Sequence, residues 1–436
     1  MFIKYLFIRL FFVFFGIVLL GGCSGHDVTT KAYYQSKAFQ NKVLIPGTYH
    51  RVLYRSFYKK YFNPWSSNPI LIKAKQLAYD FDYFAAKPGF NEAKTKRKSV
   101  WYKTLKHSAN LATFPNHQRR AITIKNTALR KLPTKKPHYE DIYNNANDHP
   151  IDLFQNSHLA ANLPVLILHV TRNNDWAYVY AGYASGWVPI DDLAYVSDDF
   201  VKKFKNFKTF VSVVNEKTAV YSSRKHFEYY ANIGMVFPTH KHSKNRYYVK
   251  IARSNKQRQA YLLEAYFEKQ SAVKQPYLLT PKRVKLLSER LLDQPYGWGG
   301  LYENRDCSSL VRDLFIPFGI YLPRNSKSQA KKGGVYIDFE QLSPKEKEMF
   351  VIKNAVPYVT LLWLPGHIML YVGVENGRAM VLHNLWGVRS KDLLKRKIVG
   401  KVLVSTLEPE NMFESYDKKM TLLKRLEGMS VLVPRY

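Results

Sequence analysis

The cysteine at position 307 is the residue best suited to covalent chemistry. It lies in Arg305-Asp306-Cys307-Ser308-Ser309-Leu310, and the chain has one other cysteine, Cys23. If Cys23 carries a lipid, as its neighbours indicate, Cys307 has no disulfide partner within an exported chain. Its thiol is then either an unreactive side chain of the hydrophobic core or a nucleophile, and the polar residues on both sides favour the nucleophile.

The local pattern predicts that Cys307 lies in the first turn of a helix, with Asp306 as the N-cap. Apolar residues recur after it at helical spacing: Leu310, Val311, Leu314 and Phe315. Free amides and the helix dipole stabilise a thiolate at such a position, so we expect a lowered pKa for this thiol. The same spacing aligns Cys307 with the apolar face, which leaves a core cysteine as the alternative.

A cysteine nucleophile needs a base. Most of the 13 histidines lie in basic or polar surroundings, whereas His367 and His383 lie in strand-like segments of the same domain as Cys307. His367 begins the apolar run 366–374, and His383 lies in the next run, 379–384. Each histidine taken alone is more simply explained by a structural role. Together with an unpaired thiol in the same domain, they predict that Cys307 is the nucleophile, His367 the base and His383 the residue that orients this base.

The turn between these two strands decides whether the histidines can meet. A two-residue turn at Asn376-Gly377 would place His367 and His383 on opposite faces of the sheet. A three-residue loop, with Gly377 in the left-handed conformation, pairs Val374 with Arg378 and places both histidines on one face, a diagonal step apart. We predict this second register.

The N-terminus has the pattern of an export signal. Lys4 and Arg9 precede the apolar run 10–20, and Leu20-Gly21-Gly22-Cys23 follows. The run is short for a membrane span, which needs about 20 apolar residues. The last four residues resemble a bacterial lipobox, so we expect residues 1–22 to be a signal peptide and Cys23 the acylated first residue of the mature chain. An uncleaved anchor with an incidental cysteine is the alternative.

The charge is strongly basic, with 67 Lys and Arg against 33 Asp and Glu. In a cytosolic protein this would suggest nucleic acid, but an export signal removes that partner. Anionic lipid headgroups or an acidic cell wall are the partners we expect instead, unless the excess reflects a general lysine bias of the source. The serine after Cys23 favours an outer-membrane, periplasm-facing anchor if two membranes exist.

The pattern along the chain predicts an α+β protein of several domains. Short strands separated by turn-rich stretches indicate two small β-barrels, preceded by a mostly helical segment. The expected order is a tether at 23–48, a helical segment at 49–115, barrels at 116–200 and 205–270, and a catalytic domain at 276–436.

Asp306-Cys307-Ser308-Ser309, then residues 366–373, then Leu382-His383-Asn384 together resemble the NlpC-type cell-wall cysteine peptidases, whose domain is papain-like. Residues 322–326 and Gln329 also resemble that family, and Ser326 with Gln329 fits a capping box. The resemblance spans about 280 to 406. Segments 127–133 and 62–65 resemble the tandem SH3-like domains and the N-terminal segment of some members.

The resemblance implies a function that needs no cofactor or metal: hydrolysis of the γ-D-glutamyl–diamino acid bond in peptidoglycan stem peptides or muropeptides. It also implies that Asp306 and Ser308, with Ser309 as a further candidate, bind the free amine of an L-alanine. A tyrosine from the SH3-like region would join them, but several could serve. Many relatives have Gly where this chain has Ser309, which could narrow the cleft or alter amine recognition.

Two other readings stay open. An amidase or acyltransferase on the same scaffold would use the same triad. A basic wall-binding lipoprotein with an inactive terminal domain would use only the SH3-like modules.

Overall fold

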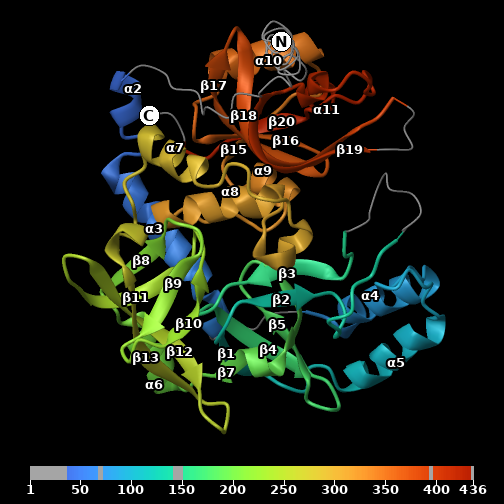
Figure 1. Ribbon diagram of the computed structural model, residues 1–436, viewed down its shortest axis with the longest axis vertical. Coiled ribbons are helices and arrows are strands. Elements are labelled where there is room, and N and C mark those ends of the chain that lie inside the picture. The colour runs from blue at the N-terminus through green and yellow to red at the C-terminus, as the bar shows by residue number, and fades with distance from the viewer. Residues whose placement is uncertain (1–36, 67–71, 141–150, 392–395, 434–436) are drawn as a thin grey trace, which may run out of the picture. The chain divides into compact units, whose positions relative to one another are not determined.

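The computed structural model describes residues 37–66, 72–140, 151–391 and 396–433. The predicted signal peptide, Cys23 and most of the tether lie outside these residues. Among the described helices, none has the length and apolar character needed to cross a membrane. The fold is the expected α+β arrangement of a helical N-terminal segment, two SH3-like barrels and a C-terminal mixed domain (Figure 1).

The N-terminal segment is helical and packs on the first barrel. Its Trp65 is 2% exposed and donates from Nε1 to the carbonyl of Ala121 at 2.8 Å. Trp187 of the first barrel packs in one cluster with Phe81 and Tyr102. This segment comprises α2 (Lys37–Asn41), α3 (Gly47–Tyr61), η2 (Asn63–Trp65), α4 (Ala74–Ala86), α5 (Ser99–Ala109) and η3 (Leu111–Thr113).

The first barrel is a seven-stranded antiparallel sheet in the order β3-β2-β6-β5-β4-β1-β7. Alternating burial along its strands, as in β3 and β5, places one face of the sheet in the core. Its strands are β1 (Arg119–Thr123), β2 (Thr127–Arg130), β3 (Gln155–Leu159), β4 (Pro164–Val170), β5 (Trp176–Tyr180), β6 (Ser185–Pro189) and β7 (Leu193–Tyr195), with η4 (Ile190–Asp192) between the last two.

Helix α6 (Asp198–Lys205) joins the two barrels, and the Ser197 side chain caps it by accepting from the Phe200 amide. The second barrel repeats the design in the order β10-β9-β13-β12-β11-β8-β14. It contains β8 (Thr209–Val213), β9 (Thr218–Ser222), β10 (Phe227–Ala231), β11 (Val236–His242), β12 (Arg246–Ser254), β13 (Ala260–Glu268), η5 (Lys269–Ser271) and β14 (Ala272–Lys274).

The C-terminal domain has a six-stranded antiparallel sheet in the order β15-β20-β16-β17-β18-β19, with helices on both faces. Its strands are β15 (Val335–Asp338), β16 (Thr360–Leu364), β17 (His367–Glu375), β18 (Arg378–Arg389), β19 (Arg396–Thr406) and β20 (Gly428–Val431). Its helices are α7 (Pro281–Glu289), η6 (Trp298–Glu303), α8 (Cys307–Phe315), η7 (Ile316–Phe318), α9 (Ser326–Lys332), α10 (Pro344–Asn354), η8 (Pro409–Met412) and α11 (Leu422–Arg425).

Strand alternation assigns the two faces of this sheet. Leu361 packs in the cluster that contains α8, whereas its neighbour Leu362 packs in the cluster that contains α10. Helix α8 packs against β17 and β18 (Figure 1). The residue at the start of α8 is thereby brought to the strands that carry the two histidines.

Candidate active site

Cys307 is the first residue of α8, as predicted. Asp306 is the N-cap, and its carboxylate accepts from the Ser309 amide at 2.8 Å, while Ser309 Oγ accepts from the Asp306 amide at 2.9 Å. The Cys307 side chain is only 7% exposed, and its Sγ lies 4.0 Å from the carbonyl oxygen of Gly366. The thiol therefore points to the turn that begins the His367 strand.

The predicted direction of the thiol pKa is wrong. Burial, followed by the adjacent Asp306 carboxylate, raises the pKa of Cys307 to about 12. The backbone amides of Ile368 and Ser308 act in the opposite direction, as expected at a helix start, but they are outweighed. The helical position was predicted correctly. The burial that dominates the thiol pKa depends on how α8 packs in the whole domain, which a helix pattern does not reveal.

The hairpin of β17 and β18 differs from the predicted loop. Glu375 pairs with Arg378, which makes Asn376-Gly377 a two-residue turn with both residues at positive φ, 49° and 75°. The three-residue loop is therefore wrong. A bulge between Tyr371 and Gly373 then shifts the register by one residue.

That bulge restores the predicted relation of the histidines. Beyond it Leu370 pairs with Leu382, so His383 lies beside Met369 on the neighbouring strand, in the register that the three-residue loop was expected to produce. The His367 Nε2 and His383 Nδ1 atoms are 2.8 Å apart. The two histidines meet because of the bulge and not because of the turn.

The hydrogen bonds around the histidines define which nitrogens carry protons. Ser405 on β19 donates its single hydroxyl proton to the Thr406 carbonyl at 2.7 Å, so its Oγ accepts from His383 Nε2 at 3.0 Å. His383 Nδ1 is then an acceptor, and His367 Nε2 donates to it. This order leaves the lone pair of His367 on Nδ1, where it can accept a proton.

Both histidines are neutral in this arrangement. Burial, followed by the positive charge of Arg425, lowers the pKa of His367 to about 4. Burial and the neighbouring His367 lower the pKa of His383 well below its usual range. A neutral imidazole is the form that accepts a proton from a thiol.

Tyr296 lies within electrostatic reach of the thiol, and sequence analysis did not select it. Burial raises its pKa well above the usual range, and Cys307 and Asp306 add to this effect. Its ring packs on Trp386 of β18 at 5.5 Å between centroids. A phenol held in the protonated form is a hydrogen-bond donor beside the nucleophile.

The three residues expected to bind an amine lie together, and Arg324 joins them. The Asp306 carboxylate accepts from Arg324 Nη2 at 2.6 Å and from Ser308 Oγ at 3.0 Å, and Arg324 Nη1 donates to Ser308 Oγ at 2.9 Å. Arg324 and its hydrogen bonds lower the pKa of Asp306 to about 2 against the effect of burial. Arg324 Nε also donates to Ser157 of β3 at 2.8 Å, which ties this cluster to the first barrel.

The predicted capping box at Ser326 and Gln329 is wrong. Asn325 is the N-cap of α9 and accepts from the Ser328 amide at 2.8 Å. Gln329 is fully buried and instead donates to the Ser308 and Pro323 carbonyls at 2.7 and 2.8 Å. Its role is to hold the first turn of α8, a contact that local sequence spacing does not reveal.

The second barrel is joined to the nucleophile segment through Arg305. This guanidinium is buried and donates to both carboxylate oxygens of Glu216, at 3.0 and 3.1 Å, and to Asp313 at 2.9 Å. Asn384, next to His383, donates to the Arg305 carbonyl at 2.7 Å. Arg305 is thus fixed from both sides, directly before Asp306 and Cys307. Within the described residues, no cluster of His, Cys, Asp and Glu has the composition of a metal site.

Four family models match successive parts of the chain. They are an N-terminal NLPC_P60 stabilising domain at residues 13–114, an SH3 domain of SH3b1 type at 137–189, an SH3 domain of SH3b2 type at 197–244 and the NlpC/P60 family at 293–408. No curated protein matches the chain.

Two solved structures share the fold. One is an NlpC/P60 endopeptidase from Photobacterium damselae subsp. piscicida, at 22% identity and a TM-score of 0.81, which covers 92% of this chain and 97% of that one. The other is an NlpC/P60 family protein from Bacillus cereus, at 16% identity and a TM-score of 0.50, which covers 72% of this chain and 100% of that one. The chain therefore consists of a helical NlpC/P60 stabilising segment, two SH3 domains and a C-terminal NlpC/P60 domain.

Proposed function

We propose that this chain is a cysteine endopeptidase that cleaves the γ-D-glutamyl–diamino acid bond of peptidoglycan stem peptides. The observation that carries the proposal is the ordered series of hydrogen bonds from Ser405 through His383 to His367, together with a Cys307 thiol that lies 4.0 Å from the carbonyl oxygen of Gly366, the residue before His367. The match of residues 293–408 to the NlpC/P60 family supports a cell-wall peptidase.

In the proposed reaction the thiol proton passes to His367 Nδ1 as Cys307 Sγ attacks the γ-carbonyl carbon. Because burial holds the thiol neutral before substrate arrives, proton transfer and attack are coupled rather than preceded by a stable thiolate. His383 stabilises the imidazolium by accepting from His367 Nε2, and Ser405 keeps His383 in the tautomer that can do so.

The negative oxygen that forms on the carbonyl needs donors. The Tyr296 hydroxyl and the backbone amide of Cys307 at the helix N-terminus are the groups that we propose for this role. Collapse of the intermediate breaks the C–N bond, and His367 returns its proton to the leaving amine of the diamino acid. Water, deprotonated by His367, then hydrolyses the thioester and restores the thiol.

We further propose that Asp306, Ser308 and Ser309 bind the free amine of an L-alanine. Asp306 remains ionised above about pH 2, which suits an ammonium ligand. Its carboxylate already pairs with Arg324, so the amine has to share or replace that contact. Acetylation of the stem amine should therefore slow cleavage if this pocket selects the substrate.

A lipid on Cys23 would hold the enzyme at a periplasm-facing membrane, with the outer membrane preferred. This proposal rests on the sequence: the basic start and apolar run 10–20, Leu20-Gly21-Gly22-Cys23 for the anchor, and Ser24 for the preferred membrane. Mass spectrometry of the N-terminal peptide of membrane-extracted protein tests it. An acylated Cys23 supports the anchor, and a peptide that retains residues before Cys23 without acylation contradicts it.

Product analysis on purified muropeptides tests the reaction. The endopeptidase releases the diamino acid with the rest of the stem and leaves L-alanyl-D-glutamate. Release of the intact stem from the sugar would show an amidase instead, and transfer of the acyl group to an added amine without net hydrolysis would show an acyltransferase.

A further inference from the structure

Three arginines gather at one edge of the C-terminal domain and take no part in the proton relay. Arg389, the last residue of β18, lies directly across the sheet from Arg396, the first residue of β19. Burial lowers the pKa of Arg425 on α11, and the charges of Arg389 and Arg396 add to this effect, so Arg425 lies near both. We call these three residues the arginine cluster; Figure 1 shows the elements that carry them.

The arginine cluster is an unfavourable arrangement for the sheet itself, because like charges directly opposite on adjacent strands are destabilising. The salt bridges of the described residues include none to Arg389 or Arg425. Arg389 is exposed, and Arg396 and Arg425 are half-buried, so solvent reaches all three. Groupings that oppose local stability are typical of functional sites.

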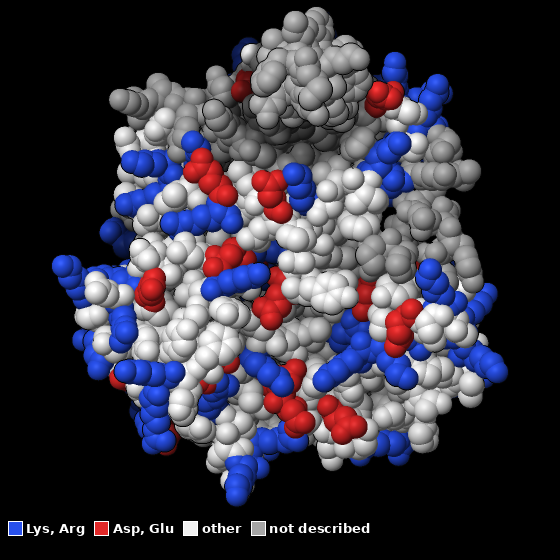
Figure 2. All heavy atoms as spheres, viewed as in Figure 1, with Lys and Arg blue, Asp and Glu red and all other residues white. Residues whose placement is uncertain are grey.

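The acids near the arginine cluster do not balance its charge. Glu410 and Glu427 act on Arg425 from beyond ion-pair distance, and burial raises the pKa of Glu410 to about 7, so that carboxyl is partly protonated at neutral pH. Segments 389–391, 396–397 and 417–427 hold eight Lys and Arg residues against two acids, Asp417 and Glu427. Basic side chains are correspondingly prominent at the upper right of Figure 2, where α11 and β19 lie in Figure 1.

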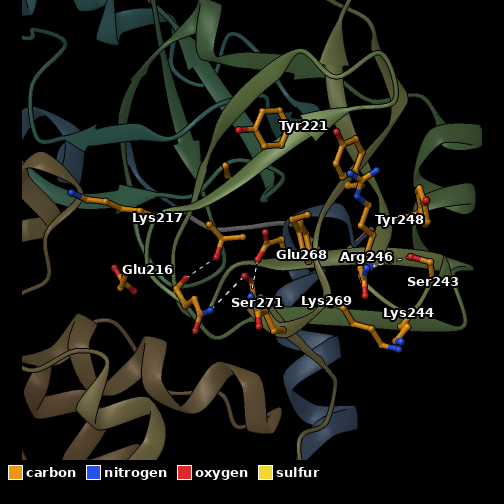
Figure 3. A pocket seen from close by; sticks show the side chains of 17 residues that line it. Glu216, Lys217, Tyr221, Ser243, Lys244, Arg246, Tyr248, Glu268, Lys269 and Ser271 are labelled. Atoms are coloured by element: carbon orange, nitrogen blue, oxygen red, sulfur yellow. Dashed lines mark hydrogen bonds between the residues drawn. The ribbon is translucent and has the colours of Figure 1, made fainter.

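The large hollow of the second barrel shows the opposite situation. Its volume is about 940 Å³, and it is bordered by Lys217 and Arg246 but also by Glu216 and Glu268 (Figure 3). Both signs of charge meet there, so the hollow does not select a ligand by charge. The arginine cluster does, because a site with one dominant charge concentrates ligands of the opposite charge.

Arg425 connects the cluster to the nucleophile. Its Nη2 donates to the carbonyl of Pro365 at 3.1 Å. The carbonyl oxygen of the next residue, Gly366, lies 4.0 Å from Cys307 Sγ. After burial, the charge of Arg425 is also the cause that lowers the pKa of His367. The cluster therefore borders the reacting thiol on the side of the turn that begins β17.

Arg396 reaches the same site from β19. Burial raises the pKa of Tyr296, and the charges of Arg324 and Arg396 act against this rise, so Arg396 lies within electrostatic reach of the phenol. Trp386, on the strand that ends at Arg389, packs on the Tyr296 ring at 5.5 Å between centroids. The cluster and the thiol thus belong to one continuous region.

The pocket proposed for the L-alanine amine approaches the thiol through different elements. Asp306 is held there by Arg324, which in turn donates to Ser157 of the first barrel. If the L-alanyl-D-glutamyl half of the stem lies at Asp306, the leaving diamino acid half extends from Cys307 toward the arginine cluster. That half carries carboxylates, which guanidinium groups bind through paired hydrogen bonds.

We propose that Arg389, Arg396 and Arg425 bind a carboxylate on the leaving half of the stem peptide. This inference rests on the proposed peptidase function and names what the enzyme selects on the far side of the cleaved bond. The carboxylate has two possible sources. One is the second carboxylate of diaminopimelate, which a lysine stem lacks, and the other is the C-terminal carboxylate of the stem.

Full-length protein is assayed on stem tetrapeptides that differ by one carboxylate. One pair has diaminopimelate or lysine as the leaving residue, and the other ends in a carboxylate or a carboxamide. The test variant is R389Q/R396Q, and Arg425 is kept because it acts on His367. K397Q is the matched control, since Lys397 is exposed and follows Arg396 on β19, which places it on the opposite face of the strand.

We expect the wild type and K397Q to lose about tenfold in kcat/KM at low salt when the bound carboxylate is removed from the substrate, mainly through KM. R389Q/R396Q should show that tenfold loss on the complete stem and no further loss when the carboxylate is removed. The substrate pair whose difference disappears identifies the source of the carboxylate. Because each comparison is made within one variant, partial misfolding affects both substrates equally.

Equal cleavage of both members of each pair by the wild type would overturn the inference, and so would unchanged discrimination by R389Q/R396Q. If the wild type cleaves no stem, the proposed function is refuted, and binding of the leaving product decides this inference alone. Diaminopimelyl-D-alanine is then titrated into Cys307→Ala with and without R389Q/R396Q. About tenfold weaker binding by the combined variant supports the arginine site, and equal binding contradicts it.

Discussion

Replacement of Ser405 by alanine tests the proton order of the histidine pair. His383 is fully buried, and in the variant its Nε2–H loses the Ser405 oxygen that accepts it. An unsatisfied buried donor costs about 1–3 kcal/mol. The pair can reduce this cost by moving the His383 proton to Nδ1, which reverses the bond to His367 and places the His367 proton on Nδ1.

In that reversed tautomer His367 has no lone pair to accept the thiol proton. A shift of about 1.4–2.8 kcal/mol in the tautomer equilibrium corresponds to a tenfold to hundredfold loss of the competent form. We expect kcat to fall by that factor with KM nearly unchanged, because Ser405 lies behind His383 and the substrate does not reach it. Steady-state cleavage of a defined stem peptide, with the product quantified by chromatography, measures both constants.

Two variants control the experiment. Ser405→Thr keeps a hydroxyl at the same place and should retain most of the activity. Ser430→Ala removes another fully buried hydroxyl of the same sheet, one without a hydrogen-bond partner in the described structure, and should leave kcat unchanged. A folded Ser405→Ala enzyme with wild-type kcat would refute the assigned proton order.

Three further predictions follow from the site. Since the pKa of His367 is lowered to about 4, the acidic limb of kcat/KM should lie well below the usual histidine value of about 6.5, and Arg425→Gln should move it upward. Because the pKa of Cys307 is raised to about 12, iodoacetamide should alkylate the substrate-free enzyme more slowly than free cysteine at pH 7. Glu216→Gln should lower the free energy of unfolding by roughly 2–4 kcal/mol, because Arg305 keeps only Asp313 as an acidic partner.

Each of these three predictions would be contradicted by a specific result. An acidic limb near pH 6.5 would show that His367 titrates normally, and rapid alkylation at pH 7 would show a thiolate in the free enzyme. A Glu216→Gln protein as stable as Glu289→Gln, which loses a partly exposed pair with Lys285 within one helix, would show that the Arg305 contact contributes little. Denaturant unfolding of the wild type, Glu216→Gln and Glu289→Gln makes that comparison.

The depressed histidine pKa also fixes the direction of the pH dependence of stability. Near pH 6.5 and below, the unfolded chain protonates His367, while the folded chain does not until about pH 4. The unfolded state therefore binds more protons in this pH window. The contribution of neutral His367 to the free energy of unfolding is thus fully present above about pH 6.5 and is lost as the pH drops toward 4. Burial of His383 acts in the same direction.

Local sequence patterns predict the elements of this site well. The Asp306 N-cap, the helix behind Cys307 and the two histidine strands depend on nearest neighbours and on spacing, and the structure has all of them. The register of the histidines was reached for the wrong reason, because a bulge near Val372 has no local signature as clear as Asn376-Gly377.

Contacts between distant segments could not be predicted from spacing. Ser405, Tyr296 and Arg324 meet the site through folding of strands and loops that are far apart in the chain. Two signals were available: a polar Ser405 in the apolar run 402–405, and the family resemblance of residues 322–326, which include Arg324 but give it no role. The predicted lowering of the Cys307 pKa was wrong for the same reason. The helix start lowers it, but burial by other elements is a property of the whole domain.

The central claim is that Cys307 is the nucleophile of a stem-peptide peptidase, and one measurement tests it most directly. Purified muropeptides are incubated with wild-type protein and with Cys307→Ala, and the products are identified by mass spectrometry. We predict cleavage between D-glutamate and the diamino acid by the wild type and no cleavage by the variant, with equal unfolding midpoints. The same products from both proteins would contradict it.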